Sequence, residues 1–175
     1  MYYYPSASSR SVTSPPARAY EPLPDYRGVA YADGWTDLAL GHERSAFRYF
    51  SRAAARAADD GAPKVGYAIA AAMLGDHRRA AWAMRRALTT DPYSLSALRL
   101  DERLLGRLDR LAESYADAAD GAHNYDADFM LAALSELLGD HALARIAIDT
   151  AIERGDRSDA ARILRDMIPD DTDGY

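Results

Sequence analysis

Three histidines are the side chains of this sequence best suited to hold a metal ion. His42 directly follows Gly41, and His77 and His141 each follow a Gly-Asp pair. A histidine-based metal site needs several ligands that meet at one point. These histidines belong to separate segments, and none has a second acidic ligand at helix spacing. We therefore expect turn histidines and no metal site.

Other catalytic chemistry finds no matching pattern. The chain has no cysteine, and it lacks a phosphate-binding glycine loop, a nucleophile elbow and a His-Glu metal motif. The carboxylates in "DERLLGRLDR" have the spacing of a solvated helix face. The tail "DDTDGY" resembles the start of a calcium loop but lacks its first aspartate and its distal glutamate. The sequence predicts a non-enzyme without a cofactor.

The charged residues suggest a second kind of chemistry, the binding of anions. Two groups of arginines have helical spacing and would form a basic ridge for an acidic partner, a membrane surface or nucleic acid. The alternative is a solvent face paired with Glu43, Asp59 and Asp60, which we favour because the net charge is −6 and no exposed aromatic or lysine pattern accompanies the arginines. Trp82 lies among them, either stacked beneath the guanidiniums or filling a joint. The ridge residues are Arg44, Arg48, Arg52, Arg56, Arg78, Arg79, Arg85 and Arg86.

Four Leu-Gly pairs divide the helical runs that would position these side chains. Their glycines are Gly41, Gly75, Gly106 and Gly139, at intervals of 34, 31 and 33 residues. Five residues after three of them comes an alanine, and nine residues after comes a large side chain. A glycine that turns the chain, followed by a small residue that lets two helices approach, is typical of stacked helical hairpins. The alanines are Ala46, Ala80 and Ala144, and the large residues are Phe50, Met84 and Ile148.

This pattern resembles the tetratricopeptide repeat family, a helix-turn-helix of 34 residues. The best match is "YAIAAAMLGDHRRAAWAMRRALTTDP" (67–92); "GWTDLALGHERSAFRYFSRAAARA" (34–57) and "LAALSELLGDHALARIAIDTAI" (131–152) also match. The usual early tryptophan is missing, and Arg99 occupies the small-residue position of the third copy. There we expect a short helix after Pro92 and a new helix capped by Asp101. The resemblance implies a bacterial-type member with an all-α, TPR-like α-solenoid of three to four hairpins and a C-terminal capping helix.

The expected domain organisation follows from these boundaries. Residues 1–26 are rich in Tyr, Ser and Pro and are predicted to be disordered. The helical repeat domain covers 27–168, with repeats at about 27–60, 61–91, 92–124 (degenerate) and 125–156 and a capping helix at 157–168. Residues 169–175 form an acidic tail. Without a hydrophobic leader, a cytoplasmic location is the default expectation; an exported or cell-envelope protein is the alternative if Met1 is not the native start.

The resemblance also implies a concave groove lined by the first helix of each hairpin. In this sequence the groove would be unusually apolar and would bind an apolar or aromatic peptide or helix. The alternative is that the same side chains are ordinary core, since some must pack between helices. The groove residues are Tyr31, Trp35, Leu38, Val65, Ile69, Met73, Phe129, Ala133 and Glu136.

The predicted function is a non-catalytic protein–protein interaction scaffold whose partner binds in this groove. One alternative is a structural self-assembly unit, a homo-oligomer in which the tail "MYYYPSASS" fills its own or a neighbour's groove. A further alternative is a basic-ridge module for an acidic partner or nucleic acid. Nucleic-acid and membrane partners are both disfavoured.

Overall fold

The computed structural model of the chain describes residues 31–120 and 124–169. These residues form helices and no strands, which confirms the predicted all-α class. None of the described helices is long and apolar enough to cross a bilayer. The predicted N-terminal tail (1–26) and all but the first residue of the acidic tail (169–175) lie outside the described residues. The helices are α1 (Ala32–Leu40), α2 (Glu43–Arg56), α3 (Ala62–Met73), α4 (His77–Thr90), α5 (Glu102–Asp120), α6 (Tyr125–Leu138), α7 (His141–Glu153) and α8 (Asp159–Met167).

Glycines form the tight turns of three hairpins, α1–α2, α3–α4 and α6–α7. Gly41, Gly75 and Gly139 have φ angles of 82°, 83° and 79°, so the predicted left-handed turn geometry is confirmed. A side chain is strained in this region, whereas glycine is not. The two aspartates that follow Gly75 and Gly139 begin the next helix: the Asp76 carboxylate accepts the Arg79 amide, and Asp140 accepts the Leu143 amide at 3.0 Å. A Gly-Asp pair thus ends one helix and begins another.

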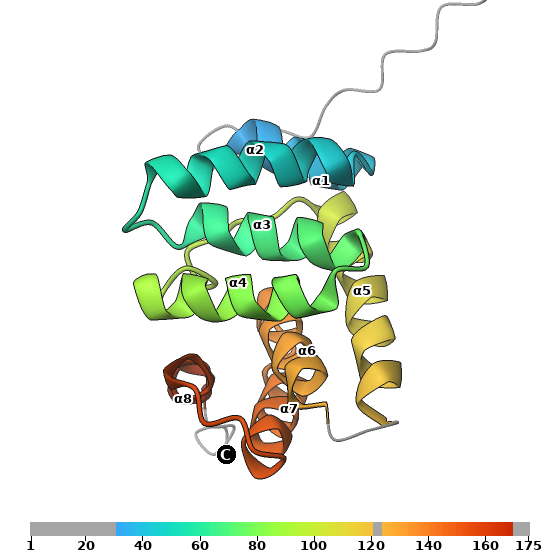
Figure 1. Cartoon of the computed structure of the whole chain (residues 1–175). Coiled ribbons are helices and arrows are strands. Elements are labelled where there is room, and N and C mark those ends of the chain that lie inside the picture. Colours follow the sequence, from blue (N-terminus) through green and yellow to red (C-terminus); the bar gives the residue numbers. More distant parts are fainter. Residues whose placement is uncertain (1–30, 121–123, 170–175) are drawn as a thin grey trace, which may run out of the picture.

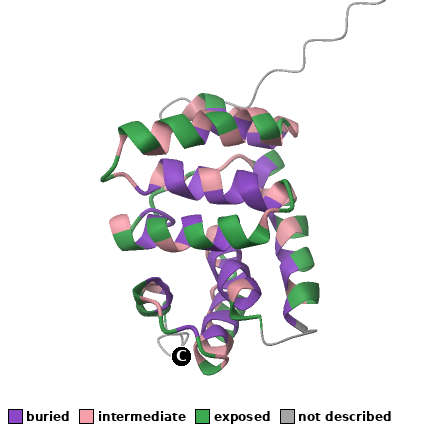
Figure 2. Ribbon diagram, in the orientation of Figure 1, coloured by how far each residue is buried: buried purple, intermediate pink, exposed green. Residues whose placement is uncertain are grey.

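Small residues let the two helices of each hairpin approach closely. Ala46, Ala80 and Ala144 have no exposed surface, and neither do the large side chains four residues later in each helix. The first helices are the inner ones: nine residues of α3 and nine of α6 are buried, whereas α2 and α4 expose a polar face (Figure 2). This division follows from the sequence, because α2 and α4 carry the arginines, whereas the first helices have no arginine and are richer in apolar residues.

The third Leu-Gly pair does not form a turn. Gly106 lies inside α5, a single helix of 19 residues that replaces the third hairpin. The Asp101 carboxylate accepts the Arg103 amide at 2.8 Å, where the new helix was predicted to begin. The short helix expected after Pro92 is wrong, because residues 92–97 form consecutive turns. The segment 91–101 passes behind α3 and adds Leu95, Leu98 and Leu100 to the core (Figure 1).

The two halves of the described chain run in different directions. Helices α1 to α4 lie side by side in a stack, while α6 and α7 lie at a steep angle below them and α5 runs along one edge (Figure 1). Helix α8, predicted as a C-terminal cap, packs against α7 and also against α4. Its apolar face includes Ala160 and Leu164, which are fully buried, and the Ser158 hydroxyl accepts the Ala161 amide to begin it. The helix therefore closes the lower half against the upper one.

Candidate partner-binding surface

The side chains predicted to line an open groove are largely core residues. Trp35, Leu38, Val65, Ile69, Phe129 and Ala133 have no exposed surface at all. The groove prediction is therefore wrong for these six positions, and the alternative of ordinary core is correct. Two features account for their burial: the inner helices pack on one another, and the 91–101 segment contributes its leucines to the same core. A partner has no access to these side chains.

The other three predicted groove residues are partly buried and hold the fold together. The Tyr31 hydroxyl donates to Asp60 at 2.6 Å, and burial together with this bond raises the pKa of Tyr31 to about 12. The Met73 sulfur lies 3.9 Å from the Arg107 guanidinium. Glu136 contacts the His141 ring at 2.9 Å. These contacts connect elements of the fold, so the three residues do not form a common binding surface.

The predicted basic ridge, in contrast, is mostly at the surface. Seven of its eight arginines are exposed, all except Arg85. Among the described residues no ion pair engages the α2 row Arg44, Arg48, Arg52 and Arg56, because Glu43 pairs with Arg107 instead. The expectation that carboxylates neutralise this row is therefore wrong. Like charges four residues apart destabilise a helix by about 0.2–0.5 kcal/mol per pair, so the row has a cost without an internal benefit.

Aromatic side chains lie between the arginines of α2 and those of α4. Phe47 stacks on Tyr67 with ring centroids 4.5 Å apart, and the Arg79 guanidinium lies 5.8 Å from the Phe47 ring. On α4 the Trp82 indole is 59% exposed and lies 5.9 Å from the Arg86 guanidinium. Such contacts orient guanidiniums without neutralising their charge. We call Phe47, Tyr67, Arg78, Arg79, Trp82 and Arg86 the aromatic–arginine surface.

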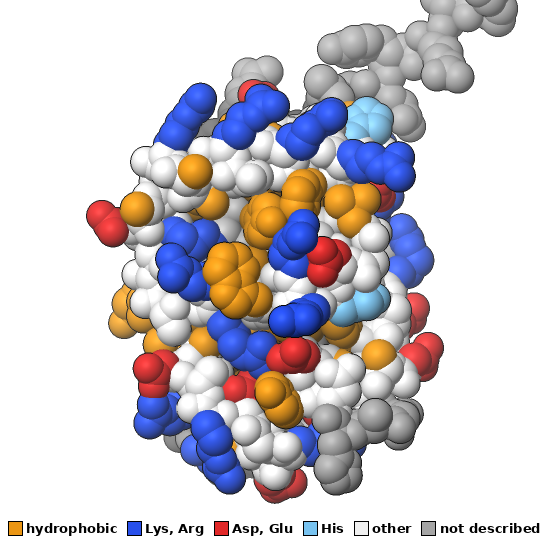
Figure 3. Space-filling model, in the orientation of Figure 1, with side chains coloured by type: hydrophobic (Ala, Val, Ile, Leu, Met, Phe, Trp, Pro, Cys, Tyr) orange, Lys and Arg blue, Asp and Glu red, His pale blue; other side chains and the backbone are white. Residues whose placement is uncertain are grey.

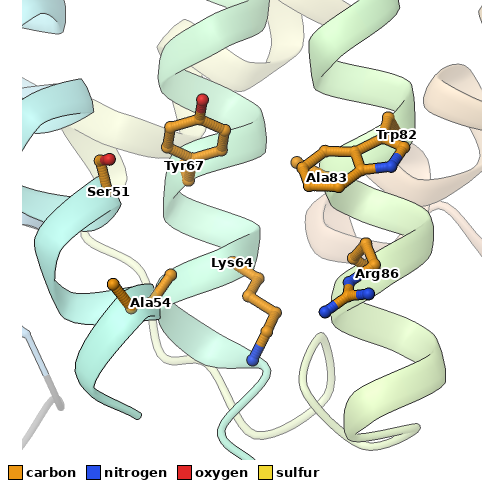
Figure 4. Close-up of a pocket in the computed structure, with 8 residues that line it drawn as sticks. Ser51, Ala54, Lys64, Tyr67, Trp82, Ala83 and Arg86 are labelled. Carbon is orange, nitrogen blue, oxygen red and sulfur yellow. The ribbon is translucent and has the colours of Figure 1, made fainter. Parts of the chain in front are cut away.

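This surface is hollowed on both sides of Trp82. One hollow, of about 280 Å³, lies between α2, α3 and α4, and a second, of about 470 Å³, lies toward the start of α4; both are lined by Tyr67 and Trp82. On the molecular surface, hydrophobic side chains gather over α3 and α4 with basic side chains above and below them (Figure 3). In the first hollow Tyr67 and Trp82 stand on adjacent helices, and Ser51 and Ala54 of α2 form the opposite side (Figure 4).

Lys64, the single lysine of the chain, also lines the first hollow but has a structural role. Its ammonium donates to the carbonyl oxygens of Ala58 and Asp60, each at 2.7 Å, where the α2–α3 connection turns. Burial lowers the pKa of Lys64. In Figure 4 its nitrogen points away from Trp82 toward that connection. With donors committed to backbone carbonyls, Lys64 holds the connection in place and is not placed as a nucleophile.

Arg85, predicted to belong to the ridge, is instead the centre of an internal charge network. Its guanidinium contacts Asp126 at 2.6 Å and Asp156 at 2.7 Å, and it lies 4.4 Å from the Phe129 ring. Only 18% of its side chain is exposed, and the Asp156 side chain is 3% exposed. The network joins α4 to α6 and to the α7–α8 connection. Placing Arg85 on the surface was therefore wrong.

The network predicts a loss of stability in acid. Burial alone would raise the pKa of Asp156, but hydrogen bonds from Arg85 and Ser158 hold this pKa below its usual value. The unfolded chain therefore binds this proton first, so the contribution of Asp156 is complete above about pH 4 and declines as the pH falls through its lower folded-state pKa. We expect the urea midpoint to fall less steeply between neutral and acid pH in Asp156→Asn than in the unmodified chain. Parallel pH dependence in the two proteins would contradict this role.

The turn histidines lie apart, as expected. His42 contacts Asp37 at 3.3 Å, His77 contacts the Tyr115 hydroxyl at 3.0 Å, and His141 contacts Glu136. Within the described ranges no three His, Asp or Glu side chains are grouped to hold a metal. His42 and His141 therefore pack beside their own turns, whereas His77 connects the α3–α4 turn to α5.

No protein-family model, curated protein or solved structure matches the chain. The aromatic–arginine surface therefore rests on the geometry alone. The sequence carries one signal for this surface: Arg79, Trp82 and Arg86 are three and four residues apart, which places a tryptophan between two arginines on one helix face. What the sequence did not show is that Phe47 and Tyr67, from two other helices, extend the same face.

Proposed function

We propose that the protein is a non-catalytic interaction module whose aromatic–arginine surface binds an acidic polypeptide segment with an aromatic or apolar side chain. The observation that carries the proposal is Trp82, a large side chain left 59% exposed beside the Arg86 guanidinium. Tryptophan and arginine dominate the binding energy of protein interfaces. The surface offers an indole for an apolar side chain and cations for flanking carboxylates.

The charge balance of the surface favours an anionic ligand. Asp76 is the one acidic residue lining its two hollows, and Asp76 is already paired with Arg79 at 3.2 Å. A chain with a net charge of −6 has placed this set of guanidiniums together. Guanidiniums bind carboxylates in a bidentate geometry, and a partly desolvated pair is stronger than one in open solvent. An acidic segment would thus neutralise Arg78 and Arg86, which make no ion pair among the described residues.

We also propose that the scaffold under this surface is a set of TPR-like helical repeats, α1–α2, α3–α4 and α6–α7. The support is the recurrence of a left-handed glycine, a buried alanine and a buried large residue in each hairpin. In this arrangement the exposed second helices, α2 and α4, present the ligand-binding side chains. The binding surface thus lies on the second helices, in place of the apolar groove expected on the first.

Calorimetric titration with a short synthetic peptide of Glu and Phe tests the function. We expect binding that weakens as salt is added, and Trp82→Ala should weaken it at least about tenfold, equivalent to about 1.4 kcal/mol. Ile146→Ala is the matched control, because Ile146 is 64% exposed on α7, outside this surface. Equal affinity of Trp82→Ala and the unmodified protein would overturn the proposal. Tighter binding of a single-stranded RNA oligonucleotide than of the peptide would replace it with nucleic-acid recognition.

A further inference from the structure

A second groove, of about 540 Å³, lies on a different part of the molecule, between α5 and the α6–α7 hairpin. Its floor is apolar and includes Ala112, Leu131 and Leu138, and its rim is acidic. The rim carboxylates are Glu102, Asp109, Glu113 and Asp140. Within the described residues, no ion pair engages any of these four, and all are exposed. The groove and the aromatic–arginine surface thus have opposite charges, acidic and basic, and both have apolar side chains at the centre.

A buried polar atom in the groove is also without a partner. Ser135 lines the groove on α6, is 1% exposed, and its hydroxyl has no hydrogen-bond partner among the described residues. A buried hydroxyl without a partner is unfavourable, because it gives up the hydrogen bonds that it makes to water in the unfolded chain. With rim carboxylates that make no ion pair and an unsatisfied hydroxyl beneath its floor, the groove has polar groups whose interactions the described fold does not complete.

The spacing of the groove side chains matches that of the tryptophan stripe on α4. On α5 the order is Glu102, Leu105, Asp109, at intervals of three and four residues, and all three line the groove. On α4 the order is Arg79, Trp82, Arg86, at the same intervals. At 1.5 Å of rise per residue, the outer charges of both stripes are about 10 Å apart. Two helices laid side by side in the same direction would pair each carboxylate with a guanidinium, with Trp82 against Leu105.

We propose that the occupant of this groove is α4 of a second copy of the chain. That copy places its Trp82 in the groove, and the arginines on either side of Trp82 pair with the rim carboxylates. This inference rests on the proposed function, because it names the acidic, apolar partner of the aromatic–arginine surface. The two stripes are on different helices of one molecule, so the contact is head-to-tail: each copy can bind one neighbour through α4 and another through α5. Such contacts build rings or open chains.

Sedimentation velocity at rising protein concentration tests the contact. We expect the mean mass of the full chain to increase with concentration at low salt and to return to the monomer at high salt. Two variants each remove one side of the contact. The stripe-deficient variant is Arg79→Gln, Trp82→Ala, Arg86→Gln, and the groove-deficient variant is Glu102→Gln, Asp109→Asn. Circular dichroism confirms that each is folded, and Ile146→Gln is the control that should assemble normally.

A mixture of the two variants provides the decisive readout. Each alone should be monomeric, but the intact groove of the first and the intact stripe of the second should form a one-to-one dimer that cannot grow. An unmodified chain that stays monomeric at low salt would overturn the inference. So would a mixture that forms no dimer. The proposed function is tested separately by peptide titration. If the chain stays monomeric but binds the peptide, the proposed function stands and the contact between copies is overturned. If the chain assembles but does not bind the peptide, the contact between copies stands and the proposed function is overturned.

Discussion

Replacing Arg85 by methionine is expected to destabilise the fold by about 3 kcal/mol, because it leaves a buried carboxylate without a cation. The Asp156 side chain is 3% exposed, and its interaction with Arg85 offsets the cost of burying its charge. Methionine retains much of the length and volume of the side chain, so packing against Phe129 is largely preserved. The loss should appear as a lower urea midpoint with an unchanged denaturant slope.

Two further variants separate the buried interaction from the exposed one. Asp126→Asn removes the other partner of Arg85, a side chain that is 39% exposed, and should cost less than about 1 kcal/mol. The double variant Arg85→Met, Asp156→Asn removes the uncompensated charge and should recover part of the stability lost in Arg85→Met. A near-native midpoint for Arg85→Met would show that the pair contributes little and that apolar contacts alone hold α4 to the lower half.

The hairpins were predictable because their determinants are local. A glycine sets the turn, and a small residue at a fixed distance from it sets the approach of the second helix. Gly75 and Ala80 illustrate this, and both have the predicted role in the structure. The capping helix was predictable for a similar reason, since Ser158 and one apolar face define it.

The prediction of a third hairpin failed because the Leu105-Gly106 pair lacks the rest of the pattern. Leu111 occupies the position five residues after Gly106, where the other three copies have an alanine, and α5 continues through the glycine. The prediction of an apolar groove failed because of packing between segments that are distant in the sequence. Residues on the first helices are apolar whether they line a groove or a core, and the sequence could not show that the 91–101 segment packs behind α3. Arg85 could not be separated from its neighbour Arg86, because its partners Asp126 and Asp156 are distant in the sequence.

Phe50 is the side chain that fixes the distance between the first two hairpins. It has no exposed surface, its ring centroid lies 4.8 Å from that of Trp35, and the ring occupies the space that side chains at two glycines would need. A Cβ atom added at Gly66 would lie 2.4 Å from the Phe50 ring, and one at Gly34 would lie 2.6 Å from it. Real Cβ atoms do not approach so closely, so any side chain at either position forces the helices apart.

Gly66→Ala is therefore expected to destabilise the protein by up to about 2 kcal/mol, although alanine is the better helix former. The helix preference gains about 1 kcal/mol, and overpacking costs about 1–3 kcal/mol, or more where both helices are held in place. Gly106→Ala is the matched control, because a Cβ there meets nothing within 4 Å, and it should stabilise the fold by about 0.5–1 kcal/mol. Opposite signs for the same substitution in two helices would isolate the packing cost.

The double variant Phe50→Leu, Gly66→Ala tests the contact with the Phe50 ring directly. Gly66→Ala should destabilise the Phe50→Leu protein less than it destabilises the unmodified protein. Equal effects of Gly66→Ala with and without Phe50→Leu would show that the α2–α3 contact adapts elsewhere.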